Sequence, residues 1–202
     1  MFIILTALGV AGNYFKLTLF FNVDFIFGSI FTMLAIHYYG PFAGIGTAFV
    51  SSAYTYLLWN HPYAMIIFCA ESVFISLLYR RKSENIVLLD TLYWLFPGMP
   101  LVILFYHFVM HMNYLAAFIM MLKQSMNGIM NALIAGVLIQ IWRVPLKSHK
   151  PAQEGTSFQL TLFHTIASFV LISAVIAMIL SSRAQLAKIE EEIKQQIRNT
   201  ID

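Results

Sequence analysis

Three ionisable side chains, Asp24, Glu71 and Lys123, each lie near the middle of a different long apolar segment. Each of the three residues lies about nine or ten residues from the end of its segment at one and the same membrane face. At about 1.5 Å per helical residue, this is a depth of roughly 14 Å. Half of a hydrocarbon core roughly 30 Å thick is about the same depth. Charges there are costly and usually face a protein interior or a wet cavity. The three residues therefore predict one polar site near the membrane centre.

The chemistry of this site has more than one interpretation. A lysine between two carboxylates neutralises one of them and leaves the other to meet a cation or to take up a proton. The three groups then form a ligand or ion site, or a proton-linked switch. In the alternative they form a buried ion-pair network that only locks the helices together. If two acids and one lysine all ionise, the net charge is negative, which slightly favours a cationic or amine-bearing ligand.

Amide side chains extend the polar surface around Lys123. Asn127 and Asn131 follow Lys123 at spacings of four residues, so the three share one helix face, and Gln124 lies beside them. The polar groups of this stripe would lack hydrogen-bond partners if they faced lipid. We therefore expect this face to point toward the site and Asn127 to bind the ligand.

Aromatic and polar residues gather between residues 54 and 63, at the end of the third apolar segment. They are typical of the aromatic belt at a membrane interface. The other interpretation is a lid of Asn60 and His61 over a ligand cavity with aromatic walls. The full set of predicted ligand-binding residues is Asp24, Glu71, Lys123, Asn127, Tyr56, Trp59, Asn60, His61 and Trp94.

The segment over residues 86–110 carries two further features. Asp90 lies near its cytoplasmic end, where we expect an interfacial salt bridge with the basic residues 80–82. Pro97, Gly98 and Pro100 interrupt the segment near its middle. They predict a disturbed helix, either as a simple kink or as a break that lines a binding cavity.

We expect no metal, no cofactor and no enzyme active site in these residues. His107 and His111 are four residues apart and, with His61, could form a metal site or, as the less favoured alternative, ligate a haem. No Cys, Asp or Glu is near them in sequence, so interfacial histidines are the favoured interpretation. The chain also has no Gly-rich phosphate loop, no HExxH and no GxSxG.

The composition indicates an integral membrane protein. The 202 residues are 60% hydrophobic and 10% charged, with a mean hydropathy of +0.77, whereas a soluble domain has about 25% charged residues. The pI near 9.0 does not indicate nucleic-acid binding, because the basic residues lie in loops and form no basic face. One cysteine, Cys69, excludes an internal disulfide.

Seven apolar segments predict an all-α, polytopic transmembrane bundle of about six helices plus a seventh membrane helix. They cover residues 2–12, 15–39, 41–59, 62–79, 86–110, 113–142 and 158–180. The first is too short to cross a bilayer alone at roughly 20 residues per crossing. Short turns at Gly40-Pro41, Asn60-His61-Pro62 and His111-Met112-Asn113 make the sequential helices antiparallel neighbours.

Basic residues set the predicted orientation. One face of the bundle receives Lys16 alone, and the other receives Arg80, Arg81, Lys82, Arg143, Lys147 and Lys150. The positive-inside rule makes the second face cytoplasmic. We therefore expect a multi-pass membrane protein, with the aromatic cluster on the periplasmic or extracellular face.

Four regions follow from this pattern: a ligand-sensing bundle over residues 1–142, a cytoplasmic linker over 143–157, a membrane helix over 158–180, and an extracytoplasmic amphipathic helix over 181–202. In the last, Leu186, Ile189, Ile193 and Ile197 recur at helical spacing. We expect this helix to form a homodimer contact and to lead into a further domain.

Several runs resemble a known family: GPFAG over residues 40–44, YTYLLWNHPYA over 54–64, LLDTLYWLFPGMPLV over 88–102 and LKQSMNGIMNAL over 122–133. They are similar to vitamin-uptake-like membrane sensor domains of bacterial receptors, which in turn resemble the substrate-binding subunits of energy-coupling-factor transporters. Those receptors carry a Cache-type domain and a diguanylate cyclase or histidine kinase output. The resemblance implies a small-molecule cavity that opens outward beneath Asn60 and His61.

Two functions and one structural alternative remain open. The first is a sensory input module that binds a small molecule and relays the signal to a cytoplasmic output. The second is the substrate-binding subunit of a vitamin-type uptake transporter. In the third, the charges only hold helices together. The expected partners are a small molecule and the lipid bilayer, and no nucleic acid.

Overall fold

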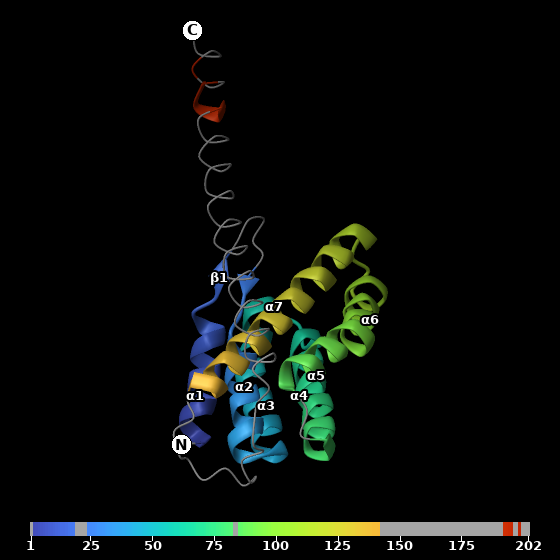
Figure 1. Ribbon diagram of the computed structural model, residues 1–202. Helices are drawn as coiled ribbons and strands as arrows, with labels where there is room; N and C mark the ends of the chain where they lie inside the picture. The colour runs from blue at the N-terminus through green and yellow to red at the C-terminus, as the bar shows by residue number, and fades with distance from the viewer. Residues whose placement is uncertain (1, 19–23, 83–84, 142–191, 196–197, 199–202) are drawn as a thin grey trace.

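A computed structural model describes residues 2–18, 24–82, 85–141, 192–195 and 198, and these residues are mostly helical (Figure 1). This agrees with the predicted all-α class. Within the described part of the chain, the continuous helix Ile86–Val109 is long and apolar enough to cross a membrane, and Phe2–Tyr14 and Tyr63–Tyr79 are shorter apolar helices. The predicted linker and membrane helix at 143–180 lie outside the described residues, and residues 192–195 of the predicted tail helix are helical and exposed.

The predicted continuous helix over residues 15–39 is wrong. Helix α1 (Phe2–Tyr14) is followed by two short antiparallel strands, β1 (Leu17–Thr18) and β2 (Asp24–Phe25), before α2 begins (Gly28–Tyr39). Thr18 pairs with Asp24 in this ribbon. Asn13 fixes the change of direction, because its Oδ1 accepts from the Gly28 N–H (2.7 Å) and its Nδ2 donates to the Ser51 carbonyl (2.8 Å).

Two antiparallel helices follow the predicted turns. Helix α3 (Pro41–Trp59) starts after Gly40, whose positive φ of 89° suits glycine, and ends at Asn60 in the left-handed conformation (φ 56°). Helix α4 (Tyr63–Lys82) then returns beside α3. Proline at the first position of α3 costs no hydrogen bond there. These turn residues confirm the predicted boundaries of the third segment.

The interrupted segment is one helix with two widened turns. It consists of α5 (Ile86–Tyr93), the π-helical η2 (Trp94–Gly98), α6 (Met99–Ile103) and the π-helical η3 (Leu104–Val109). Pro97 lies inside η2 and has no N–H to donate, so a π turn accommodates it without ending the helix. The predicted disturbance is present, and it places Trp94 at the first widened turn.

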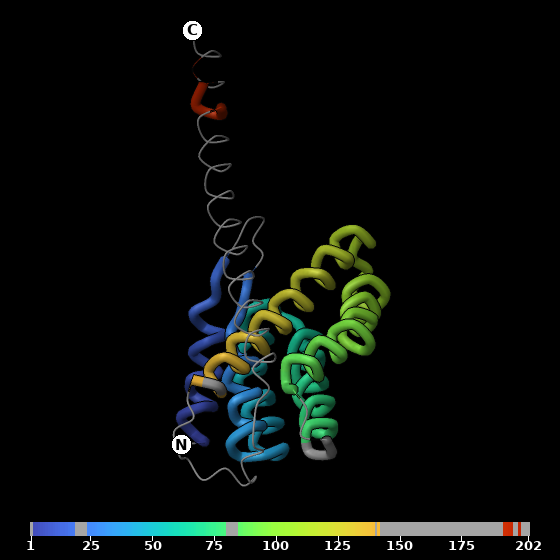
Figure 2. Tube along the Cα trace, in the orientation of Figure 1, coloured from blue at the N-terminus to red at the C-terminus, as the bar shows by residue number. Residues whose placement is uncertain are grey.

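Helix α7 (Tyr114–Ile141) crosses the bundle obliquely and packs on α2, α5 and α6 (Figures 1 and 2). Gly128 allows its closest approach, because an added Cβ would collide with the Trp94 indole. The described core is unusually polar: Asp24, Glu71, Asp90 and Lys123 are all at most 8% exposed. Many large apolar side chains, such as Phe42 at 86%, are exposed instead.

Candidate functional site

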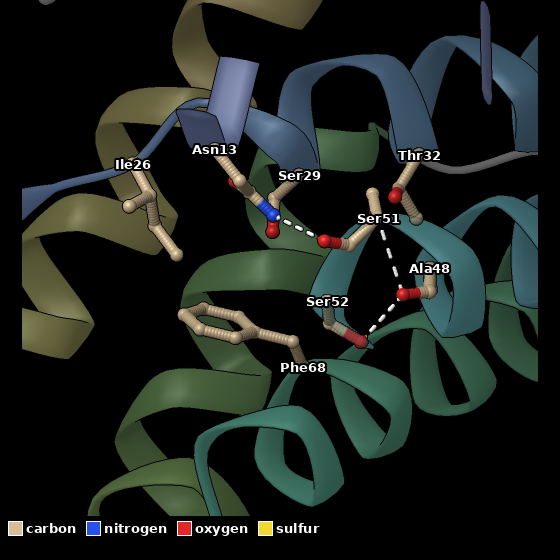
Figure 3. A pocket seen from close by; sticks show the side chains of 8 residues that line it. All are labelled: Asn13, Ile26, Ser29, Thr32, Ala48, Ser51, Ser52 and Phe68. Atoms are coloured by element: carbon tan, nitrogen blue, oxygen red, sulfur yellow. Dashed lines mark hydrogen bonds between the residues drawn. The ribbon is translucent and has the colours of Figure 1, made fainter. Parts of the chain in front are cut away.

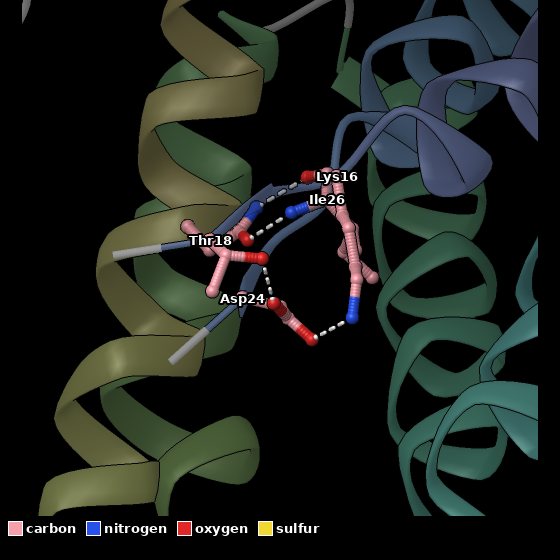
Figure 4. A network of polar contacts seen from close by, with 5 residues as sticks. Lys16, Thr18, Asp24 and Ile26 are labelled. Atoms are coloured by element: carbon pink, nitrogen blue, oxygen red, sulfur yellow. Dashed lines mark hydrogen bonds and ion pairs between the residues drawn. The ribbon is translucent and has the colours of Figure 1, made fainter. Parts of the chain in front are cut away.

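The three charges predicted to share one site are separated by the structure into two groups. Asp24 lies on the ribbon, where Lys16 Nζ is 2.7 Å from its Oδ2 and Thr18 Oγ1 donates to its Oδ1 at 2.6 Å (Figure 4). Asp24 is 4% exposed and Lys16 is 34% exposed. The partner of Asp24 is therefore Lys16, which the sequence analysis used only to set orientation.

Asn127 supports the ribbon through its side-chain amide. Its Oδ1 accepts from the Ile26 N–H at 2.8 Å, and its Nδ2 donates to the Ile26 carbonyl at 2.7 Å. Asn131 Nδ2 donates to the same carbonyl at 2.9 Å. The Asn127 side-chain amide thus pairs with the Ile26 backbone in the way that the backbone of a neighbouring strand would. The stripe on α7 faces inward as predicted, but here Asn127 satisfies protein backbone.

Lys123 lies one helical turn before Asn127 and is only 8% exposed. Its Nζ lies 4.7 Å from the centroid of the Trp59 ring, a cation–π contact. Asp24 and Lys16 lie within electrostatic range of it. Among the described residues, Lys123 has no ion pair of its own, because Lys16 holds the nearby carboxylate.

Aromatic rings continue from Trp59 to α6 and η3. The His61 ring stacks between Trp59 and Tyr63, with centroid distances of 6.4 and 5.5 Å, and meets Tyr106 edge-on at 5.3 Å. Gln124 Nε2 donates to the Tyr106 hydroxyl at 3.0 Å. Desolvation by burial lowers the pKa of His61. We call this connected set the outer polar cluster: Lys16, Asp24, Trp59, His61, Tyr63, Tyr106, Lys123 and Gln124.

Two buried polar atoms of the outer polar cluster lack partners. Gln124 Oε1 and His61 Nδ1 are each buried and accept or donate no hydrogen bond within the described residues. Gln124 itself is 1% exposed. Buried polar atoms are normally satisfied by protein, water or ligand. Sequence reasoning placed Gln124 on the stripe but missed Tyr106, whose partner is a distant residue on another helix.

Two predicted wall and lid residues have other roles in this geometry. Tyr56 is 48% exposed on α3. Asn60 is exposed, and its backbone N–H closes α3 on the Tyr56 carbonyl at 2.8 Å. Asn60 therefore forms the turn, whereas Trp59 and His61 contribute their rings to the outer polar cluster.

Glu71 and Asp90 form the second group, which we call the inner carboxyl pair. They are 1% and 0% exposed, and their carboxyl groups lie within hydrogen-bonding reach of each other. Glu71 accepts from Ser29 Oγ and from Trp94 Nε1, both at 2.8 Å. The predicted interfacial salt bridge of Asp90 is wrong, since its carboxyl is buried beside another acid. Trp94 is a donor to Glu71 here.

Both carboxyl oxygens of Asp90 lack a donor among the described side chains and backbone. The group beside them, the Glu71 carboxyl, has no hydrogen to offer when ionised. Two adjacent buried carboxylates cannot both ionise without great cost. A proton on Asp90 would supply a hydrogen bond to Glu71 and leave the Glu71 oxygens to accept from Ser29 and Trp94.

Ser29 also lines a small cavity (Figure 3). Its volume is about 10 Å³, which is enough for one water. The residues that line it are Asn13, Ile26, Ser29, Thr32, Ala48, Ser51, Ser52 and Phe68. It connects the α1–α2–α3 contact to the inner carboxyl pair through a single hydroxyl group.

No group of three His, Cys, Asp or Glu residues lies close enough to hold a metal ion within the described ranges. His107 Nδ1 shares a hydrogen bond with the Met112 carbonyl at 2.9 Å, which ties η3 to the following turn. Comparison with known proteins finds no matching family model, no matching curated protein and no matching solved structure.

Proposed function

We propose that residues 2–141 form a helical bundle embedded in a bacterial inner membrane, where it binds a small molecule as the sensory input module of a signalling receptor. The sensory role follows the family resemblance of the runs between residues 40 and 133. The binding role follows the outer polar cluster.

The distribution of polarity supports the membrane location. Five charged residues occur in residues 2–79 and 86–141, namely Lys16, Asp24, Glu71, Asp90 and Lys123, and all but Lys16 are buried. The exposed surface is rich in large apolar side chains. An open groove of about 800 Å³ on η2, α6 and η3 is lined by apolar residues, including Pro97, Leu101 and Met121. Such a surface suits lipid better than water.

Helix length gives a second argument. Helices α3, α4 and α7 have 19, 20 and 28 residues, against roughly 20 for a crossing. Their inward faces carry polar side chains such as Thr47, Ser51 and Asn127, all at most 2% exposed. These side chains keep polarity on the inward faces, and within the described part of the chain Ile86–Val109 has both the length and the apolar content of a crossing.

One observation carries the binding proposal: Lys123, only 8% exposed, has no carboxylate of its own among the described residues, and the same cluster holds the unpartnered Gln124 Oε1 and His61 Nδ1. A charge at this depth normally has a partner. In a purely structural network, we would expect Lys123 to hold Asp24, yet Lys16 does so. A bound ligand completes the arrangement.

Native mass spectrometry of gently purified protein tests this function. The expected result is a bound non-lipid mass that Lys123→Ala loses and that Lys82→Ala, a lysine substitution at the end of α4, retains. A folded wild-type protein that carries no such mass, or a Lys123→Ala variant that keeps it, would count against the proposal.

A further inference from the structure

We infer that the outer polar cluster binds the anionic group of a small planar molecule through Lys123. This inference rests on the proposed binding function and adds the sign and shape of the ligand. It reverses the preference for a cationic ligand, which assumed that Asp24, Glu71 and Lys123 share one site.

Charge in the outer polar cluster is unbalanced in the positive direction. Asp24 and Lys16 neutralise each other across 2.7 Å, and Thr18 takes the second oxygen of Asp24. Glu71 lies in the separate inner carboxyl pair, where Ser29 and Trp94 occupy its oxygens. Lys123 is left as the uncompensated charge among the described residues of the cluster. Its natural complement is a carboxylate or a similar anion.

The rings of the cluster favour a flat ligand body. Trp59, His61 and Tyr63 are half-buried, and successive interplanar angles are 24° and 29°, so their faces form a stacked series. Phe105 continues the series beyond Tyr63 at 5.0 Å and 19°, so a flat ligand body would lie along the edges of these stacked rings. The Lys123 ammonium lies over the Trp59 ring, which places the anion subsite at one end of this series.

The unpartnered atoms specify hydrogen bonds. Gln124 Nε2 donates to the Tyr106 hydroxyl, and the unpartnered Gln124 Oε1, as an amide oxygen, can only accept. The ligand should therefore carry a donor, such as a hydroxyl or amino group. His61 Nδ1 is a second free position, and as a neutral imidazole it either accepts or donates. Together these features describe a hydroxy- or amino-substituted aromatic carboxylate.

Matched probes of opposite charge test the inference. Saturation-transfer NMR in a non-ionic detergent would compare 4-hydroxybenzoate with 4-hydroxybenzylamine. We expect saturable binding of the acid and binding of the amine that is at least about tenfold weaker, because the amine would bring a second positive charge against Lys123. Lys123→Met should weaken the acid by about tenfold or more, whereas Lys123→Arg and Lys82→Met should keep the preference.

Each contrary outcome separates this inference from the proposed function. Equal or tighter binding of the amine, absence of acid binding, or acid binding that survives Lys123→Met in a folded protein would overturn the anion assignment. A co-purified non-lipid molecule that proves cationic would overturn it as well and leave the proposed function standing. A protein that is empty after purification and binds neither probe would overturn both.

Discussion

The indole N–H of Trp94 donates to Glu71 Oε1 at 2.8 Å. Trp94 is fully buried at the first π turn, and Gly128 of α7 lies against its ring. A single side chain thus joins α4, η2 and α7 around a buried acid.

Removing the indole donor should destabilise the bundle. Trp94→Phe keeps an aromatic ring but leaves Glu71 Oε1 without its donor, which should cost about 1–3 kcal/mol of unfolding free energy. Denaturant unfolding in detergent measures the change. Trp59→Phe is the control, because Trp59 is only half-buried and offers a ring face to Lys123. Equal effects of the two substitutions would contradict the role of the Trp94 hydrogen bond.

Close approach of α7 to Trp94 depends on Gly128. Gly128→Ala places a methyl group into the indole ring, and overpacking of this kind costs about 1–3 kcal/mol. Gly46→Ala is the matched control, because its added Cβ would meet only Phe2 Cζ at 3.7 Å. The two thermal midpoints should differ clearly, and a Gly128→Ala variant as stable as Gly46→Ala would show that α7 packs differently.

The inner carboxyl pair should respond asymmetrically to amide substitution. Asp90→Asn retains a neutral group that can still donate toward Glu71, so its stability should stay near that of the wild type. Glu71→Gln places an N–H₂ group among the donors of Ser29 and Trp94, which should cost about 1–3 kcal/mol. If Asp90→Asn proved the more damaging of the two, the proton would belong on Glu71 instead.

The ribbon should loosen when Asn127 is removed. Asn127→Leu leaves the Ile26 N–H without its acceptor and the Ile26 carbonyl with only Asn131. Each buried unpaired backbone group costs about 1–3 kcal/mol, so hydrogen exchange at residues 24–26 should accelerate. Ser125→Ala is the control, because the Ser125 hydroxyl bonds only to carbonyls of its own helix. Unchanged exchange in Asn127→Leu would remove Asn127 as an anchor.

Acidification should weaken the loop between α3 and α4. Burial lowers the pKa of His61 below its usual value, so the unfolded chain takes up a proton more readily than the folded one. The stability that neutral His61 provides is present above about pH 6.5 and declines as the pH falls through the lowered pKa. The effect should be small because the residue is half-exposed.

Thermal midpoints measured from about pH 7.5 down to about pH 5.5 check this sign. The wild type should lose stability relative to His61→Gln as the pH falls. His111→Gln, in the turn that follows η3, controls for a general effect of losing a histidine. A wild type that gains stability relative to His61→Gln on acidification would contradict the lowered pKa.

Glycine, proline and asparagine residues at the turns made much of the fold predictable. Gly40-Pro41 and Asn60-His61-Pro62 set the ends of α3 because only certain residues tolerate those backbone angles. Pro97 likewise predicted the disturbed helix, and it lies inside the π-helical turn η2. These signals are local, and the physical reason for each lies within a few residues.

The ribbon and the two polar groups were not predictable in the same way. Residues 17–25 are mostly apolar, with Thr18, Asn22 and Asp24 as exceptions, and a run of that kind suits a strand or a buried helix equally. In a continuous helix, Asp24 would lie at the depth of Glu71, and the pairing of Asp24 with Lys16 would not be expected. The Glu71–Asp90 contact joins two helices at the inner carboxyl pair, and a depth count along separate segments cannot show which residues face each other.

Ile26 donates to and accepts from Asn127, one helical turn along α7 from Lys123. Lys123 and Asn127, which holds the ribbon, therefore lie on adjacent turns of α7, about 5.4 Å apart along the helix axis. Any rotation of α7 that moves the Lys123 ammonium also pulls on the Ile26 peptide. A change at the Lys123 ammonium would therefore be transmitted through α7 to the backbone at Ile26.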